Sequence, residues 1–297
     1  FFKVFLMSSV SDKSSVLLPV CLIIIAMISV QSGASLAKLL FPVVGAEGAT
    51  SLRLGFGALV LTLVYKPWRT SVTRGGLLPM LVYGLVLGGM NFLFYQSIKT
   101  LPLGIAVALE FTGPLSVAIL SSRRPVDFLW VILAMLGLFV LLPIGGSNTH
   151  IDLTGAIYAI SAGACWALYI VYGKKAGIKN GQSTVAIGTL IAAVFFCPIG
   201  LVQNGLSLFG LSILPIALGV GILSTALPFS LEMMALRRIP SRTFGTLMSM
   251  EPAVGAISGM IILQEHLTLE QWGGMFAIMV ASVGATLTIR PMTKKTK

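Results

Sequence analysis

The chain has 297 residues, of which 56% are hydrophobic and only 10% are charged, and its mean hydropathy is +0.98. Soluble domains carry roughly 25% charged residues, so this composition excludes an ordinary soluble protein and indicates a membrane protein. The net charge of +11 does not indicate nucleic-acid binding, because the basic residues lie in short loops and no stacking aromatic residues accompany them.

Ten apolar segments follow one another along the chain. About 20 residues at a rise of about 1.5 Å each cross a hydrocarbon core of about 30 Å, and most of the segments approach that length. The segments are 16–37, 46–65, 77–97, 103–121 and 128–143, then 153–172, 184–202, 212–231, 243–263 and 269–289. Helices are expected, because backbone polar groups that face lipid must be satisfied within the segment. The predicted fold class is an all-α membrane protein with ten transmembrane helices.

The residues outside these segments are polar. Residues 1–15 form a leader, and residues 290–297 form a basic tail. The first methionine is Met7, so we expect it to be the natural start and residues 1–6 to be a gene-model extension. A cleaved signal peptide is not favoured, because the first apolar run is too long and lacks a small-residue cleavage pattern.

The basic residues predict how the chain is oriented. Of the 20 lysines and arginines, 17 lie in alternate connections or at the termini, whereas only Lys38 and Lys99 lie in the other connections and Arg53 lies inside a span. Lysine and arginine are enriched in cytoplasmic loops. Both termini are therefore predicted to be cytoplasmic, with an even number of crossings.

Motifs for catalysis and for metal binding are absent from the sequence. It contains no GxxxxGK[ST] loop for ATP, no HExxH and no GxSxG. Cys21, Cys165 and Cys197 lie within spans without metal-ligand spacing, so we expect buried small side chains and not disulfides. The protein is predicted not to be an enzyme and to need no cofactor, so energy for any transport must come from a gradient or a partner.

Two stretches of the chain align without a gap at an offset of 138 residues. LPLGIAVALEFTGPLSVAI begins at Leu101, and IPSRTFGTLMSMEPAVGAI begins at Ile239. Because each half has five spans, an odd number, the two copies would cross the membrane in opposite directions. Inverted repeats are typical of secondary transporters, with the substrate site near the midplane, although a duplication could also serve a channel or a scaffold. We expect residues 16–143 and 153–289 to be two repeats that rock about a central cavity.

Several runs of sequence carry a resemblance to a known family. They are SGASLAK from Ser32, LGGMNFLFYQSI from Leu87, PLGIAVALEFTGPL from Pro102, SSRRPVDF from Ser121 and STALPFSLEMMALRRIPSRTFGTLMSMEPA from Ser224. Through them, nearly the whole chain resembles two EamA domains of the drug/metabolite transporter superfamily, and is similar to its threonine/homoserine exporters. The resemblance implies an inner-membrane exporter of threonine and homoserine. The alternative is an exporter of another metabolite or of a cationic drug.

Polar residues within the apolar segments must face protein or water, because a charged side chain at that depth costs roughly 2.5–3.5 kcal/mol. Four of them lie about seven residues from the outer ends of their spans. They are Gln31, Arg53, Asn91 and Glu110. In this layer the ammonium of an amino acid would bind Glu110 and its carboxylate would bind Arg53. The structural alternatives are an Arg53–Glu110 ion pair and interhelical hydrogen bonds from the two amides.

Glu251 is a second candidate carboxyl group. The repeat places it at the counterpart of Gly113, one helical turn from Glu110, but at the opposite depth. Either glutamate could carry a coupling proton, so proton antiport is expected, and a structural carboxylate is the alternative. Pro114 and Pro252 are expected to weaken the helices beside them and to give local flexibility.

Aromatic residues are candidates for the wall of the substrate pathway, with ordinary packing as the alternative. They are Tyr95, Trp166 and Tyr169. At the edges of spans, Lys38 is expected to extend to the membrane interface, and Glu232 to pair with Arg237 or Arg238. The expected partners are an amino-acid substrate and the lipid bilayer, with no nucleic acid, and the protein is expected to be a monomer.

Overall fold

A computed structural model describes residues 17–69, 74–120, 125–141, 152–180, 183–236, 238, 244 and 247–288. These residues are helical almost throughout, and no strand occurs among them. Met7, the leader and the basic tail lie outside the described residues, as do four basic residues of the predicted cytoplasmic loops, Arg123, Arg124, Arg237 and Arg242.

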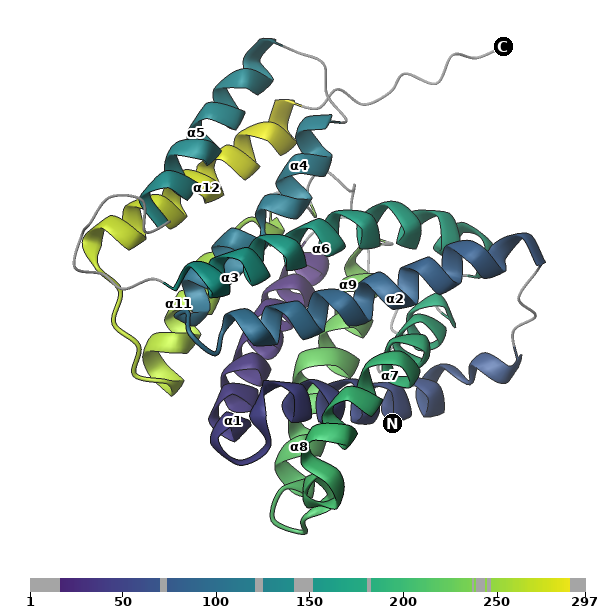
Figure 1. Ribbon diagram of the computed structural model, residues 1–297. Helices are drawn as coiled ribbons and strands as arrows, with labels where there is room; N and C mark the ends of the chain where they lie inside the picture. Colours follow the sequence, from purple (N-terminus) through teal and green to yellow (C-terminus); the bar gives the residue numbers. More distant parts are fainter. Residues whose placement is uncertain are drawn as a thin grey trace, which may run out of the picture.

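Each predicted apolar segment overlaps helical structure (Figure 1). The first half contains α1 (Leu17–Tyr65), η1 (Pro67–Arg69), α2 (Arg74–Ser97), α3 (Leu103–Glu110), α4 (Thr112–Leu120) and α5 (Pro125–Leu141). The second half contains α6 (Leu153–Asn180), α7 (Ser183–Asn204), η2 (Gly205–Phe209), α8 (Leu214–Gly221), η3 (Ile222–Ala226), α9 (Leu227–Leu236), α11 (Glu251–Ile262) and α12 (Leu269–Thr288). By length and composition, five of the described helices could each cross a membrane, and three apolar helices are shorter.

The first two predicted segments are joined by a single residue instead of a loop. α1 bends at Gly45, whose φ of 65° and ψ of 174° lie where glycine meets no steric penalty. The helix therefore continues to Val44 and resumes at Ala46. The predicted connection over residues 38–45 was wrong in length, because an apolar pattern does not mark where a glycine can turn the backbone.

The two prolines expected to weaken helices lie near helix starts. Pro114 is the third residue of α4, and Pro252 is the second residue of α11. The first N–H groups of a helix have no partner within it, so proline removes no helical hydrogen bond there. The interruptions lie just before the prolines, at Phe111 and at Met250. They leave Glu110 at the end of α3 and Glu251 at the start of α11.

The two halves of the chain are interleaved. α2 packs against α6 and α7, and α1 packs against α7, α8 and α9. α5 packs against α12, and Figure 1 shows these two helices side by side. In each of the most extensive contacts among the described helices, one helix comes from each half. The expectation that the halves rock as two separate bundles does not fit this packing, because such a motion would break most of the helix contacts.

The backbones of α4 and α6 meet beside Glu110. A Cβ atom added to Gly163 would lie 2.5 Å from the backbone oxygen of Glu110, and one added to Gly113 would overlap the backbone of Gly163. Glycines at this crossing allow the two helices to approach as closely as membrane helices can. The position of Glu110 therefore depends on Gly163.

Replacing Gly163 with alanine is expected to lower the apparent Tm of the detergent-purified protein. Overpacking costs about 1–3 kcal/mol, and each kcal/mol corresponds to roughly 2–4 °C in chains of roughly 150–250 residues. Gly219→Ala is the matched control, because a Cβ atom there meets nothing within 4 Å. Both variants gain the same helix propensity, so an equal Tm would contradict the close approach at Gly163.

One end of the bundle is held by an ion pair that joins the two halves. Lys38 Nζ donates to Glu265 Oε1 at 2.7 Å and to the backbone oxygen of Leu101 at 2.8 Å. The other oxygen of Glu265 accepts from the backbone N–H of Leu103 at 2.7 Å. We call these four residues the clamp. The expectation that Lys38 extends to the membrane interface did not include these partners, because Glu265 is distant in sequence.

The start of α6 lies at the same end. Asp152 accepts hydrogen bonds from the backbone N–H groups of Thr154 and Gly155, at 3.2 and 3.1 Å, and so caps the helix. A hydrogen bond with the side chain of Thr100, together with these backbone bonds, holds the pKa of Asp152 below its ordinary value. The beginning of the second half is thereby tied to the α2–α3 connection.

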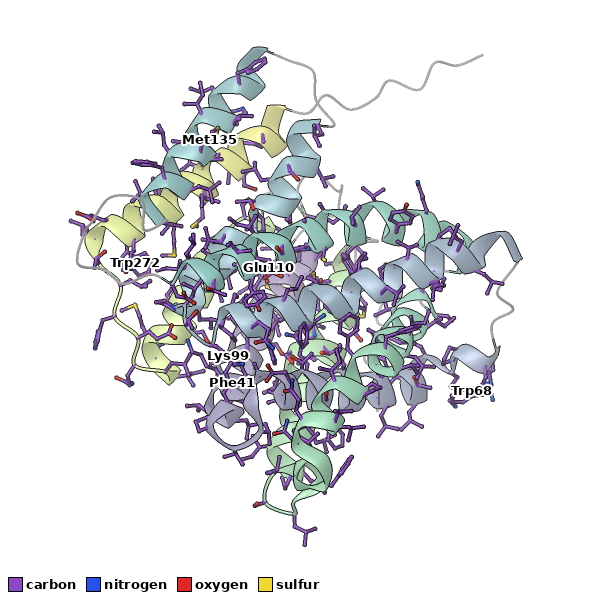
Figure 2. The ribbon with its side chains drawn as sticks, in the orientation of Figure 1. Phe41, Trp68, Lys99, Glu110, Met135 and Trp272 are labelled. Atoms are coloured by element: carbon purple, nitrogen blue, oxygen red, sulfur yellow. The ribbon has the colours of Figure 1, made fainter. Side chains whose placement is uncertain are left out.

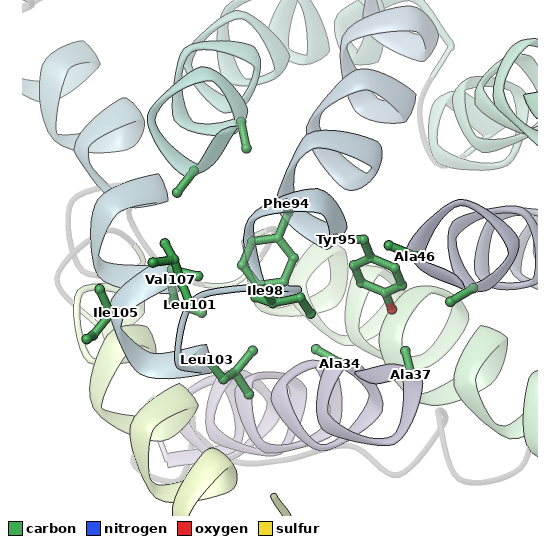
Figure 3. Packing of buried hydrophobic residues seen from close by; sticks show 14 of the residues in the cluster. Ala34, Ala37, Ala46, Phe94, Tyr95, Ile98, Leu101, Leu103, Ile105 and Val107 are labelled. Carbon is green, nitrogen blue, oxygen red and sulfur yellow. The ribbon is translucent and has the colours of Figure 1, made fainter. Parts of the chain in front are cut away.

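The largest apolar cluster lies next to the clamp (Figure 3). Its buried residues include Ala34, Phe94, Tyr95, Ile98, Leu101, Leu103, Ile105 and Val107. Leu101 and Leu103 supply backbone groups to the clamp. The bundle is therefore closed at this end by an ion pair and by apolar packing.

All three cysteines are free, and Cys21 is exposed, contrary to the expectation that it is buried.

Candidate functional site

A cavity within the bundle brings together most of the predicted site residues. Its volume is about 70 Å³, well below the roughly 300–1,000 Å³ usual for sites that hold drug-sized ligands. The predicted residues that line it are Gln31, Arg53, Asn91, Glu110, Trp166, Tyr169 and Glu251. Figure 2 places Glu110 near the centre of the molecule. Ala34 and Phe94 line the cavity and also belong to the apolar cluster, so the cavity borders the packing that closes the clamp end.

Arg53 is 4% exposed and is held on three sides. Its Nε donates to Thr225 Oγ1 at 3.2 Å, and its Nη2 donates to the backbone oxygen of Ser224 at 2.8 Å. Its Cζ lies 5.2 Å from the centroid of the Tyr95 ring, within the range of a cation–π interaction. No ion pair within 4.0 Å joins Arg53 to Glu110, although both residues are described. The structural alternative of a direct Arg53–Glu110 pair is therefore not formed.

Tyr95 supports the site without lining it. Its side chain is fully buried beneath Arg53, and it does not border the cavity. Its hydroxyl group has no hydrogen-bond partner among the described residues. Asn91 does border the cavity, but its Nδ2 donates to the backbone oxygen of Leu87 at 2.7 Å, within α2. The alternative that this amide bonds between helices is therefore not seen.

A π-helical turn explains how Arg53 is held. In η3 the N–H of Leu227 bonds to the oxygen of Ile222, and Pro228, the next residue, has no N–H. The backbone oxygens of Leu223 and Ser224 are thereby released from the helix, and such groups must find partners inside a membrane. Ser29 Oγ donates to the oxygen of Leu223 at 2.6 Å, and Arg53 donates to that of Ser224.

Two glycines bring α1 onto this turn. A Cβ atom on Gly33 would lie 2.8 Å from the backbone nitrogen of Ser224, and one on Gly57 would lie 2.8 Å from the Cβ of Thr225. Sequence reasoning did not predict this contact. The available signal was the Ser224-Thr225 pair, shortly before Pro228 in an otherwise apolar segment.

The two predicted carboxyl groups differ in their surroundings. Gln31 Nε2 donates to Glu251 Oε1 at 3.1 Å. The remaining oxygens of both side chains, Gln31 Oε1 and Glu251 Oε2, are buried and have no partner among the described residues. The Glu110 side chain is 7% exposed and makes no hydrogen bond or ion pair in the described part of the chain. Buried oxygens without partners are costly, so these groups call for a proton, a water molecule or a ligand.

Glu110 and Glu251 were predicted to lie at opposite depths, and one cavity reaches both of them. The two aromatic residues of α6 that were predicted to line the pathway are each packed on one side. Trp166 lies edge-on to Phe111, with ring centroids 5.4 Å apart, and Tyr169 stacks on Tyr83 at 4.9 Å. They fill both roles considered for them, because they pack against neighbouring rings and also line the cavity.

Glu232 also lines the cavity, which the sequence analysis did not predict. The expected partner Arg237 lies outside the described residues, and no ion pair joins Glu232 to Arg238. The available signal was a glutamate directly after the apolar segment 212–231, one helical turn after Phe229. Among the described residues, no group of three His, Cys, Asp or Glu side chains could hold a metal ion.

Comparison with known proteins identifies the family. The model of the EamA-like transporter family matches residues 153–287. Threonine/homoserine exporter RhtA of Salmonella typhimurium is 62% identical over 278 residues, which cover 94% of each chain. Threonine/homoserine exporter RhtA of Escherichia coli K12 is 60% identical, over 95% of this chain and 96% of that protein. This chain belongs to the EamA-like transporter family.

Two more distant matches cover most of the chain. The uncharacterized transporter YwfM of Bacillus subtilis is 26% identical over 69% of this chain and 71% of that protein. A solved crystal structure shares the fold, with a TM-score of 0.60 at 17% identity, over 93% of this chain and 98% of that one. YwfM is named as a transporter and the two RhtA proteins as exporters, and the described part of this chain is helical almost throughout, with helices apolar enough to cross a membrane.

Proposed function

We propose that this protein is a secondary transporter of the bacterial inner membrane that exports threonine and homoserine by alternating access. The observation that carries the mechanism is one cavity lined by a guanidinium group and by carboxyl groups. The identity of 60–62% to the exporters of two bacteria supports the substrate. A zwitterion presents an ammonium and a carboxylate, and the cavity offers a partner for each.

Arg53 is the proposed partner of the substrate carboxylate. Guanidinium has five N–H donors, and the bonds to Thr225 and Ser224 use two of them. The other donors can bind a carboxylate in the planar fork that suits it. The carboxyl groups of Glu110 and Glu251 are the proposed partners of the ammonium, with Gln31 and Asn91 as further polar contacts.

We also propose ten transmembrane helices in two inverted repeats, residues 16–143 and 153–289, with both termini in the cytoplasm. A two-fold relation between the repeats would pair α5 with α12, α3 with α11, and the second part of α1 with α7. Contacts between these elements support it. Few basic residues occur at the clamp end of the bundle, which contains residues 38–48, 96–103, 152–155 and 259–265. This supports a periplasmic location for the clamp.

A flux measurement tests the transport proposal directly. Purified protein in proteoliposomes loaded with labelled threonine should release it faster than protein-free liposomes, and unlabelled homoserine should compete. If proton antiport through Glu110 or Glu251 drives the flux, then an imposed pH gradient should change the rate and a protonophore should abolish that change.

The cavity holds more carboxyl groups than guanidinium groups, which favours a cationic drug as the alternative substrate. Release of a cationic dye without release of threonine would support that alternative.

Thr225 offers a test of how Arg53 is positioned. Thr225→Val keeps the branched shape but removes the hydroxyl group that accepts from Arg53 Nε. A hydrogen bond to a charged group contributes about 1.5–3 kcal/mol, so we expect the KM for threonine to rise by about tenfold or more. Thr225→Ser retains the hydroxyl and is the matched control. Equal KM values for the valine and serine variants would show that this bond does not position Arg53.

A further inference from the structure

Glu232 is a cavity carboxyl group that the zwitterion site does not use. It lies on α9, four residues before the helix ends at Leu236, and on the same face as Phe229, one turn earlier. Tyr169 of α6 lines the cavity as well. In the described part of the chain, Glu232 has no hydrogen bond and no ion pair.

Other oxygen atoms of residues that line the same cavity also lack a hydrogen-bond donor. Glu251 Oε2 and Gln31 Oε1 are buried and lack partners among the described residues, and these side chains are only 7% and 3% exposed. An ammonium group carries three donors and no acceptor, so it can satisfy such oxygens, whereas a carboxylate cannot. Aromatic faces also attract cations, and Phe229 and Tyr169 line the cavity together with Glu232.

We propose that Glu232, Phe229 and Tyr169 form an ammonium-binding subsite at the α9 end of the cavity, where a substrate binds before its ammonium moves on to Glu251 and Gln31. We call it the Glu232 subsite. This inference rests on the proposed export function, and it adds the position at which the cytoplasmic substrate is first held. The chain after α9 is basic, and the clamp closes the opposite end, so this subsite lies on the side from which an exporter loads.

Kinetics of the full-length protein in proteoliposomes test the Glu232 subsite. Glu232→Gln should raise the KM for threonine by about tenfold, which corresponds to about 1.4 kcal/mol, and should leave the maximal rate within about twofold. Glu232→Asp retains the charge and should restore most of the affinity. Glu270→Gln, which changes an exposed glutamate at the start of α12, is the matched control and should behave like the wild type. An unchanged KM in Glu232→Gln would overturn the proposal, as would a fall in maximal rate alone.

Ligand binding in detergent separates this inference from the export proposal. Threoninamide keeps the ammonium but lacks the carboxylate, whereas N-acetylthreonine keeps the carboxylate but lacks the ammonium. Threoninamide should raise the Tm of the wild type and of Glu270→Gln, and Glu232→Gln should need about tenfold more of it for the same shift. N-acetylthreonine should act equally on all three proteins. If the wild type transports no threonine, a Glu232-dependent threoninamide shift still supports the subsite. Equal threoninamide curves overturn it.

Discussion

Replacing Arg53 with alanine is expected to reduce threonine export in proteoliposomes by at least about 30-fold while the protein still inserts into the membrane. Truncating one partner of a buried, hydrogen-bonded charge pair costs about 2–5 kcal/mol or more, and the substrate carboxylate would lose such a partner. The variant also leaves the oxygens of Thr225 and Ser224 without their donor. We therefore expect a lower Tm as well as a lower rate.

The controls separate binding from folding. Arg53→Lys keeps the charge but not the planar fork, and should retain part of the activity with a raised KM. Arg69→Ala removes an exposed arginine that does not line the cavity, and this variant should export normally. Near-normal export by folded Arg53→Ala protein would leave the proposed carboxylate site without support.

Replacing Glu110 with glutamine is expected to lower export by at least about tenfold with little change in Tm. Glutamine keeps the size of the side chain and removes its negative charge. The Glu110 carboxyl group makes no hydrogen bond or ion pair in the described part of the chain, so the substitution breaks no such contact. An ammonium bound to a carboxylate gains about 1.5–3 kcal/mol, which is the affinity that the variant should lose.

Flux measured with and without a pH gradient shows which role Glu110 has. If Glu110 carries the coupling proton, export by Glu110→Gln should no longer respond to the gradient. If it only binds the ammonium, the KM should rise and the response should persist. Glu270→Gln is again the exposed control. Wild-type kinetics and an intact pH response in Glu110→Gln would remove Glu110 from the mechanism.

The cavity residues could be predicted because charge is costly in lipid. Arg53, Glu110 and Glu251 stood out as charged groups inside apolar segments, and each of them lines the cavity. Their mutual contacts could not be predicted from depth. Arg53 binds Thr225 and the oxygen of Ser224 because a π-helical turn and a proline release that oxygen. Depth along a span gives no information on which way a side chain faces around the helix.

Residues at the ends of spans were the hardest to assign. Lys38 was expected to reach the interface, and Glu232 to pair with a neighbouring arginine, because nearby residues are the only partners that a sequence displays. The structure pairs Lys38 with Glu265, 227 residues away, and places Glu232 on the cavity. The proposed repeat likewise predicted two similar halves without predicting that their helices would interleave.

The interleaving has a consequence for biosynthesis. The glycines Gly84 and Gly88 of α2 fit against Ile191 and Phe196 of α7, which the ribosome makes about a hundred residues later. A nascent first half therefore enters the bilayer before α7 can fill these grooves, and it cannot complete its packing until the second half has been made. Nonsense mutations in the second half should consequently yield no stable remnant, and membrane proteases should clear the truncated chain.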